Sequence, residues 1–268
     1  MFVIFLFLFT ITGCQEKAAY IGKLAYGEYF IRGDIRILNN DTILNGPIKY
    51  FDSSNRLIAV FTYKDNLKLG KAIRYQNEKI VQETNFYFDY ENGLKLDYDS
   101  TGELVAKSNY FFDRQVGPRT NYSNGDPYYF RFVNFDQQIL YECKYNKGAI
   151  EKEKGSVLHY TTDYVEEEGI NKLQIFIYVI EPPYSKISYK LYDVNLGTET
   201  GQLVHEFIST NGYVQNVIIE PPKKNHKYIL RTDLFFERDN ITKQNEAELV
   251  LPKSMNDQDN LKQSPLEK

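Results

Sequence analysis

Tryptophan is absent from this 268-residue sequence, which also contains only two methionines, two cysteines and three histidines. So few histidines and cysteines leave little material for a metal cluster or for a Cys/His catalytic centre. The formal net charge of −4 lacks the excess of basic residues that is typical of a nucleic-acid-binding face. We therefore expect no cofactor, no metal site and no nucleic acid partner.

The abundant residues are aromatic instead, with 23 tyrosines and 18 phenylalanines. Aromatic side chains fit the pleated, half-buried surface of a β-sheet. The composition is 42% hydrophobic and 25% charged, as in an ordinary folded protein. The sequence therefore predicts a folded chain that is built mainly from strands.

An apolar run, MFVIFLFLF, fills residues 1–9. It is too short to cross a bilayer as a helix, which needs about 20 residues, but it has the length of the hydrophobic part of a secretion signal. The next segment, Ile11-Thr12-Gly13-Cys14, resembles the lipobox of bacterial lipoproteins. In that family the signal is cut before the cysteine, whose thiol then carries the lipid. The alternative is a buried strand that ends in a structural cysteine.

The lipobox resemblance implies a signal peptide over residues 1–13, a lipidated (palmitate-bearing) Cys14 and a linker over residues 14–21. Two or three acyl chains anchor a protein stably, since each buried methylene contributes about 0.8 kcal/mol. By the same resemblance, Gln15 after the cysteine implies the outer membrane of a Gram-negative cell, with either face open. Cys143 would then be the one remaining thiol, interpreted as a buried strand residue, with a reactive thiol as the alternative.

Glycines recur with a period of about 24 residues: Gly46, Gly70, Gly93 and Gly117 are 24, 23 and 24 positions apart. A tyrosine follows each glycine by four or five positions, at Tyr50, Tyr75, Tyr98 and Tyr122. Each unit reads as strand, polar turn and strand, which is a β-hairpin. Because one hairpin is marginal in water, neighbouring hairpins are expected to stack and to bury a shared aromatic stripe.

These units resemble the MORN-like repeats of bacterial exported proteins, over residues 22–148. The resemblance implies consecutive hairpins in an elongated, single-layer antiparallel sheet. Members of the family are associated with protein or lipid contacts, and some are antitoxin components. The repeat by itself assigns none of these roles. The aromatic row is either a core or a binding surface.

Seven short alternating runs follow in residues 149–252, which predicts a β-sandwich. The segment Ile219-Glu220-Pro221-Pro222 and the later Tyr228 resemble the end of a fibronectin type III or immunoglobulin-like domain. In that family a tyrosine hydroxyl ties down a proline-containing corner, a role that the resemblance gives to Tyr228. Residues 253–268 contain no aromatic residue and are predicted to form a flexible tail.

No catalytic constellation emerges from the remaining polar residues. The three histidines, His159, His205 and His226, are not at ligand spacing and are interpreted as structural or solvent-facing. The acidic run at 163–168 is a solvated loop or a weak calcium candidate. Two patterns, Asp41-Thr42-Ile43 and Asp99-Ser100-Thr101, resemble O-glycosylation sites of Bacteroidota.

The leading hypothesis is a non-enzymatic, membrane-anchored envelope lipoprotein that presents a β-repeat surface for binding or scaffolding a protein partner. One alternative is an immunity- or antitoxin-like protein that neutralises a specific effector. Another is a carbohydrate-active or carbohydrate-binding envelope protein that uses scattered carboxylates.

Overall fold

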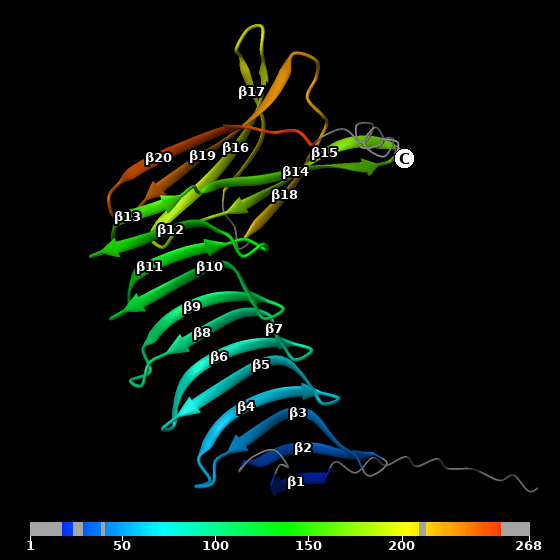
Figure 1. Cartoon of the computed structure of the whole chain (residues 1–268), viewed down its shortest axis with the longest axis vertical. Helices are drawn as coiled ribbons and strands as arrows, with labels where there is room; N and C mark the ends of the chain where they lie inside the picture. The colour runs from blue at the N-terminus through cyan, green and yellow to red at the C-terminus, as the bar shows by residue number, and fades with distance from the viewer. Residues whose placement is uncertain (1–17, 24–28, 39–40, 209–212, 253–268) are drawn as a thin grey trace, which may run out of the picture. The chain divides into compact units, whose positions relative to one another are not determined.

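The computed structural model describes residues 18–23, 29–38, 41–208 and 213–252 (Figure 1). Every regular element in these ranges is a β-strand, and the strands pair antiparallel. The predicted all-β fold of antiparallel sheets is thus confirmed. In the described part of the chain no helix is long and apolar enough to cross a membrane. The predicted signal peptide, Cys14 and the predicted tail lie outside the described residues.

The chain divides into two compact units, which we describe separately. The first comprises Met1–Gly102 together with the short segment Phe111–Asp113. The second comprises Glu103–Tyr110 and Arg114–Lys268.

The first unit is a single layer of antiparallel strands that follow one another in sequence order (Figure 1). The exception is the two-residue strand β7, which pairs with β6 beside β8. The strands are β1 (Ala18–Lys23), β2 (Phe30–Leu38), β3 (Asp41–Phe51), β4 (Leu57–Lys64), β5 (Leu67–Gln76), β6 (Lys79–Tyr87), β7 (Tyr90–Glu91) and β8 (Gly93–Tyr98). This arrangement agrees with the predicted array of consecutive hairpins.

One face of this layer carries the core of the first unit, which consists of Ile31, Ile48, Ala59, Phe61, Tyr63, Ala72 and Phe86. A single layer has no second sheet to cover such a core, so long cationic side chains cover part of it. The Lys68 ammonium lies 5.1 Å from the ring centroids of both Phe61 and Phe86. Its methylene stem can shield apolar surface while the charge interacts with the rings.

The second unit begins with five strands in sequence order: β9 (Leu104–Phe111), β10 (Arg114–Ser123), β11 (Asp126–Val133), β12 (Ile139–Asn146) and β13 (Ala149–Gly155). Seven further strands form two smaller sheets. The three-stranded sheet has the order β14 (Leu158–Glu167), β15 (Ile170–Val179) and β18 (Val214–Ile219). The four-stranded sheet has the order β17 (Gly201–Ile208), β16 (Ser185–Asn195), β19 (His226–Phe236) and β20 (Ile241–Glu248). These seven strands agree with the predicted sandwich.

A single core connects the two small sheets with strands β11 and β12. Tyr141 and Cys143 of β12 belong to it together with Ile175 of β15 and Leu230 of β19. The core therefore continues across residues 148 and 149, where the sequence predicts a domain boundary. Alternation explains this continuity, because Tyr141, Cys143 and Tyr145 of β12 are buried while Glu142 and Lys144 are more exposed.

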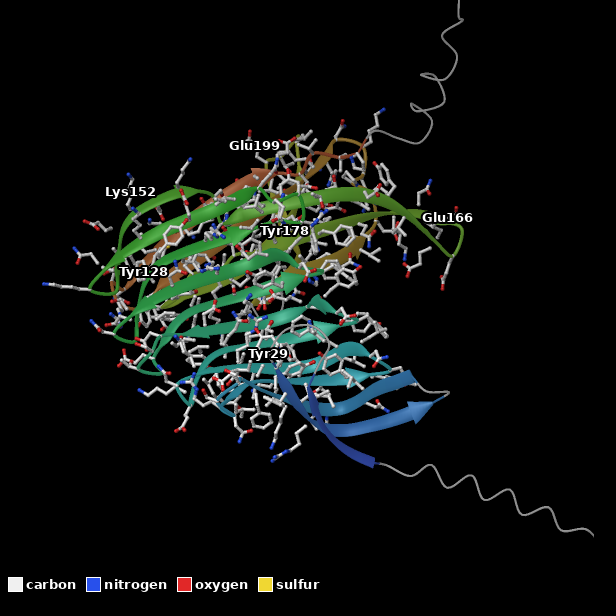
Figure 2. All side chains as sticks on the ribbon, turned by 60° about the horizontal axis from the view of Figure 1, so that its bottom comes forward. Tyr29, Tyr128, Lys152, Glu166, Tyr178 and Glu199 are labelled. Carbon is white, nitrogen blue, oxygen red and sulfur yellow. The ribbon has the colours of Figure 1, made fainter. Side chains whose placement is uncertain are left out.

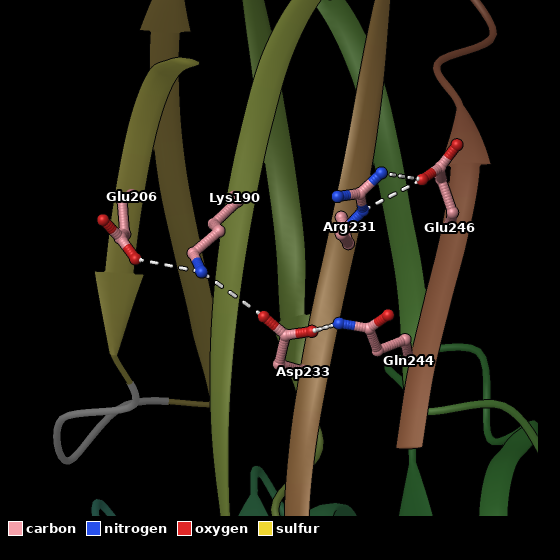
Figure 3. A network of polar contacts seen from close by, with 6 residues as sticks. All are labelled: Lys190, Glu206, Arg231, Asp233, Gln244 and Glu246. Atoms are coloured by element: carbon pink, nitrogen blue, oxygen red, sulfur yellow. Dashed lines mark hydrogen bonds and ion pairs between the residues drawn. The ribbon is translucent and has the colours of Figure 1, made fainter. Parts of the chain in front are cut away.

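The other face of the four-stranded sheet is polar (Figure 3). Lys190 on β16 lies 3.6 Å from Glu206 on β17 and 3.4 Å from Asp233 on β19. Arg231 on the same strand donates to Glu246 of β20 at 2.6 Å. These contacts link all four strands of the sheet through polar side chains.

Candidate binding surface

The four repeat glycines all adopt the left-handed backbone conformation, with φ between 80° and 101°. At Gly46 and Gly70 an added Cβ would meet no atom within 4 Å, so these positions have room for a side chain. The ladder register shifts beside both residues, as at a β-bulge. These glycines are therefore needed for their backbone conformation rather than for space.

A repeated hydrogen-bond pattern lies two residues before each of the first three glycines. The backbone N–H groups of Leu44, Lys68 and Glu91 donate to the side-chain Oδ1 atoms of Asn66, Asp89 and Asp113, at 2.6, 2.9 and 2.6 Å. The backbone N–H groups of Asn66, Asp89 and Asp113 donate back to the corresponding carbonyls at 3.0–3.1 Å. We call this reciprocal pair of bonds the Asx clasp. It ties each hairpin turn to the preceding repeat.

Each Asx residue is the second residue of a two-residue turn in which both residues have positive φ. Such turns match the twist of the flanking strands and favour Asn, Asp or Gly. In the first turn the residue before Asn66 is Asp65, with φ 49°. In the next two turns the same position holds Phe88, with φ 49°, and Phe112, with φ 47°. A bulky residue in this conformation is a genuine outlier.

Five aromatic side chains gather at these two turns, all of them within the first unit. Their exposed fractions lie between 41% and 48%, and we call them the aromatic edge: Tyr87, Phe88, Tyr90, Phe111 and Phe112. The ring centroids of Tyr87 and Phe88 are 4.6 Å apart, and those of Phe111 and Phe112 are 4.8 Å apart. Phe112 also contacts Tyr90 at 5.5 Å and Tyr87 at 6.3 Å. Exposed apolar clusters of this kind mark interaction sites.

The predicted repeat tyrosines lie elsewhere. Tyr50 packs against the core of the first unit, and its hydroxyl is 2.6 Å from that of Tyr63. Burial raises the pKa of both phenols. Tyr75, Tyr98 and Tyr122 are half-buried. Burial raises the pKa of Tyr98 and of Tyr122.

The aromatic edge is not among the predicted site residues, although the sequence carries a signal for it. Tyr87-Phe88 and Phe111-Phe112 are 24 positions apart and each pair precedes an aspartate. The predicted turns are polar or glycine-rich segments, and these segments lie at one end of the hairpins only. Phenylalanine is not a turn residue by propensity, and the turns at the other end were therefore overlooked.

Tyr228 lies at the start of β19 and is buried, and its hydroxyl donates to the carbonyl oxygen of Glu220 at 2.9 Å. This is the contact that the fibronectin type III resemblance implies for Tyr228. The family assignment itself stays a prediction.

The other candidate residues show ordinary structural contacts. Cys143 is buried, and burial raises the pKa of its thiol to about 11, so that little reactive thiolate forms at neutral pH. A ring nitrogen of His159 is 3.1 Å from the carbonyl oxygen of Leu140, and one of His226 is 2.7 Å from Asp193. His205 is exposed.

The acidic run and the glycosylation patterns can be placed only in part. Glu167 pairs with Lys172 at 2.8 Å, and the Thr101 hydroxyl donates to Asp99 at 2.6 Å. Among the described residues no group of three His, Cys, Asp or Glu side chains is arranged to hold a metal ion. The side chains of Asp41 and Thr42 lie outside those that the structure describes.

Comparison with known proteins identifies no family for this chain. No family model matches the chain, and no curated protein matches it. A solved structure of a mutant of S. aureus TarM, in complex with fondaparinux, α-GlcNAc-glycerol and UDP, is 16% identical over 37% of this chain, with a TM-score of 0.28. The match spans about a fifth (19%) of that structure's chain. A likeness at this TM-score carries no argument about fold or function.

Proposed function

We propose that this protein is a non-enzymatic, membrane-anchored envelope lipoprotein that binds a protein partner through its aromatic edge. The observation that carries the proposal is the pair of exposed phenylalanines, Phe88 and Phe112, in the left-handed conformation. Asp65 occupies the equivalent turn position in the preceding repeat with the same φ. The hairpin turn therefore forms without an aromatic residue, and the two rings serve something other than the fold.

The cost of this arrangement supports a functional role. A left-handed conformation costs an ordinary L-residue about 1–2 kcal/mol, and aspartate or asparagine less. Burial offsets this cost only in part, since each phenylalanine still exposes about two fifths of its surface. Aromatic residues are enriched at the energetic centres of protein interfaces, where burial by a partner would supply the missing stabilisation.

The geometry of the rings favours a protein partner over a sugar. The planes of Tyr87 and Phe88 meet at 77°, and those of Phe111 and Phe112 at 86°. Tyr87 and Phe112 meet at 89°. A sugar stacks on a flat ring face, whereas edge-to-face rings make a knobbed surface with pockets for side chains. The carbohydrate-binding alternative is therefore the less favoured of the two.

Anchoring at Cys14 is the second part of the proposal and rests on the lipobox resemblance. Replacing Cys14 with alanine should abolish incorporation of radiolabelled palmitate and move the protein from the membrane fraction to the soluble fraction. Unchanged labelling and unchanged membrane association would both contradict the anchor.

The aromatic edge can be tested with the variant Phe88→Asn/Phe112→Asn. Asparagine is favoured in the left-handed conformation, so the variant should fold at least as stably as the wild type. Tyr128→Asn is the matched control, because Tyr128 is an equally exposed aromatic residue on β11, outside the aromatic edge (Figure 2).

The binding experiment places a photo-crosslinking amino acid at position 88 or at position 128 in cells. We expect a discrete protein adduct from position 88 only. With the purified partner, loss of each ring should weaken binding by about 2 kcal/mol, or about 30-fold. Equal binding by the double variant and the Tyr128→Asn control would refute the proposed surface. A toxin-like effector as the adduct would identify the immunity alternative.

A further inference from the structure

Six polar side chains form two rows on one face of strands β11 to β13. Tyr129, Lys144 and Lys152 are neighbours in one row, and Arg131, Glu142 and Lys154 are neighbours in the other. We call these six residues the basic grid. Intervening residues, such as Phe130 and Cys143, belong to the buried core. The basic grid holds four cations and one carboxylate, although the whole chain has a net charge of −4.

Lys144 and Lys152 face each other across the ladder, whereas Lys154 lies opposite Glu142. No ion pair of the described residues includes Lys144, Lys152 or Lys154. The single carboxylate, Glu142, accepts a hydrogen bond from the Tyr129 hydroxyl at 2.6 Å. Lys144 and Lys152 are direct cross-strand partners, an arrangement in which like charges destabilise a sheet. An anion between them would remove that repulsion.

Protection of the sheet edge explains only part of this pattern. Strand β13 is the last strand of its sheet, and lysines on an edge strand discourage pairing with other chains. This reason accounts for Lys152, which is labelled in Figure 2, and for Lys154, since both lie on β13. It does not account for Lys144, which lies on the inner strand β12 and directly opposite another lysine.

A hollow of about 380 Å³ lies at the basic grid, lined by Tyr129, Glu142, Cys143, Lys144, Lys152, Glu153 and Lys154. Glu153 is already paired with Lys243, so the three lysines outnumber the one lining carboxylate that has no cationic ion-pair partner. This volume is in the range of small-molecule sites and exceeds that of a bare phosphate ion. We infer that this hollow binds a phosphate ester whose remaining part carries hydroxyl groups, with the lysine ammonium groups holding the phosphate and Glu142 accepting from a hydroxyl. The site lies outside the aromatic edge and does not depend on the function proposed for it.

The chemistry of the basic grid fits this ligand. Ammonium groups bind phosphate as mobile point charges, and three of them converge on the hollow. Burial and the hydrogen bond to Glu142 raise the pKa of Tyr129 to about 12, so its hydroxyl stays protonated and adds no negative charge. Glu142 would repel a bare anion that approached it, which favours an ester with hydroxyl groups on that side.

The test uses the full chain and the variant Lys144→Gln/Lys152→Gln/Lys154→Gln. The control is Lys107→Gln/Lys223→Gln/Lys224→Gln, which removes the same charge from exposed lysines away from the hollow. Both variants keep the wild-type N-terminus. Binding of glycerol 3-phosphate and of inorganic phosphate is measured by calorimetry. Binding to phosphatidylglycerol vesicles, with pure phosphatidylcholine vesicles as reference, is measured by co-sedimentation.

We expect glycerol 3-phosphate to bind the wild type and the control within twofold of each other, and the grid variant at least tenfold more weakly. Inorganic phosphate should bind the wild type more weakly than glycerol 3-phosphate does. Vesicle binding that requires phosphatidylglycerol and the three grid lysines would show that a lipid headgroup is the source of the ester. Failure of both ligands to bind the wild type, or equal losses in the two variants, would overturn the inference.

Discussion

Three substitutions at Asp89 can test how much the Asx clasp and the left-handed backbone conformation each contribute to the stability of the fold. The Asp89 carboxylate accepts from the Lys68 backbone N–H at 2.9 Å, and its own backbone has φ 69°. Asparagine keeps both the acceptor and the left-handed preference, as Asn66 shows in the preceding repeat. Glycine keeps only the backbone conformation. Alanine keeps neither.

The expected losses of unfolding free energy follow from these two terms. Asp89→Asn should change stability by less than about 0.5 kcal/mol. Asp89→Gly loses one exposed hydrogen bond, which is worth about 1 kcal/mol. Asp89→Ala adds about 1 kcal/mol for the left-handed conformation and should therefore lose about 2 kcal/mol. The return bond from the Asp89 N–H to the Lys68 carbonyl oxygen is a backbone contact and is common to all three variants.

Urea denaturation followed by tyrosine fluorescence measures these losses, since the chain has no tryptophan to mask the signal. Amide hydrogen exchange adds a local measurement, because the Lys68 N–H should lose protection in the glycine and alanine variants and keep it in the asparagine variant. Equal stability of the alanine and asparagine variants, with unchanged exchange at Lys68, would refute the structural role of the Asx clasp.

Three further outcomes can be checked on the second unit. Tyr228→Phe removes the hydrogen bond to the Glu220 carbonyl and should cost about 1 kcal/mol in urea denaturation, without change in the far-ultraviolet circular dichroism; an unchanged midpoint would contradict this contact. The Tyr184 hydroxyl and the Arg238 guanidinium lower the pKa of Asp126, so its ionised form stabilises the folded state. The stability advantage of the wild type over Asp126→Asn should be full above about pH 4, near the unfolded pKa, and should disappear as pH falls further; an advantage independent of pH would be the opposing result. Cys143 should react with a thiol reagent only after denaturation, and rapid reaction in the folded protein would show that its burial is misjudged.

The sequence allowed the strand content and the hairpin array to be predicted because both depend on local, repeating signals. A glycine every 23 or 24 residues reports a backbone conformation that other residues avoid, and the four repeat glycines do have positive φ. The alternation of apolar residues likewise reported the strands of the sandwich, such as β15 and β19. Both signals can be recognised in a short stretch of sequence, without knowledge of what that stretch packs against.

The continuity of the core across residues 148 and 149 was not predictable in this way, because it depends on contacts between distant segments. The core that joins Cys143 to Leu230 is produced by packing between residues almost 90 positions apart. Such packing leaves no periodic trace in a single sequence. Tyr228 is an instructive exception, because its partner, Glu220, is only eight residues away and a family resemblance indicated the contact.

In the turns of the first unit, one residue position is required by the fold and the other is available for contact with a partner. The second turn position is Asn66, Asp89 or Asp113, and in each case its side chain forms the Asx clasp. The first position varies between aspartate and phenylalanine with almost the same φ. Because the backbone conformation is carried by the second residue, the first can change its chemistry without changing the sheet. In an array of this kind, each turn can therefore present a different side chain to a partner without a change in the sheet. At the aromatic edge two neighbouring turns both present phenylalanine, at Phe88 and Phe112.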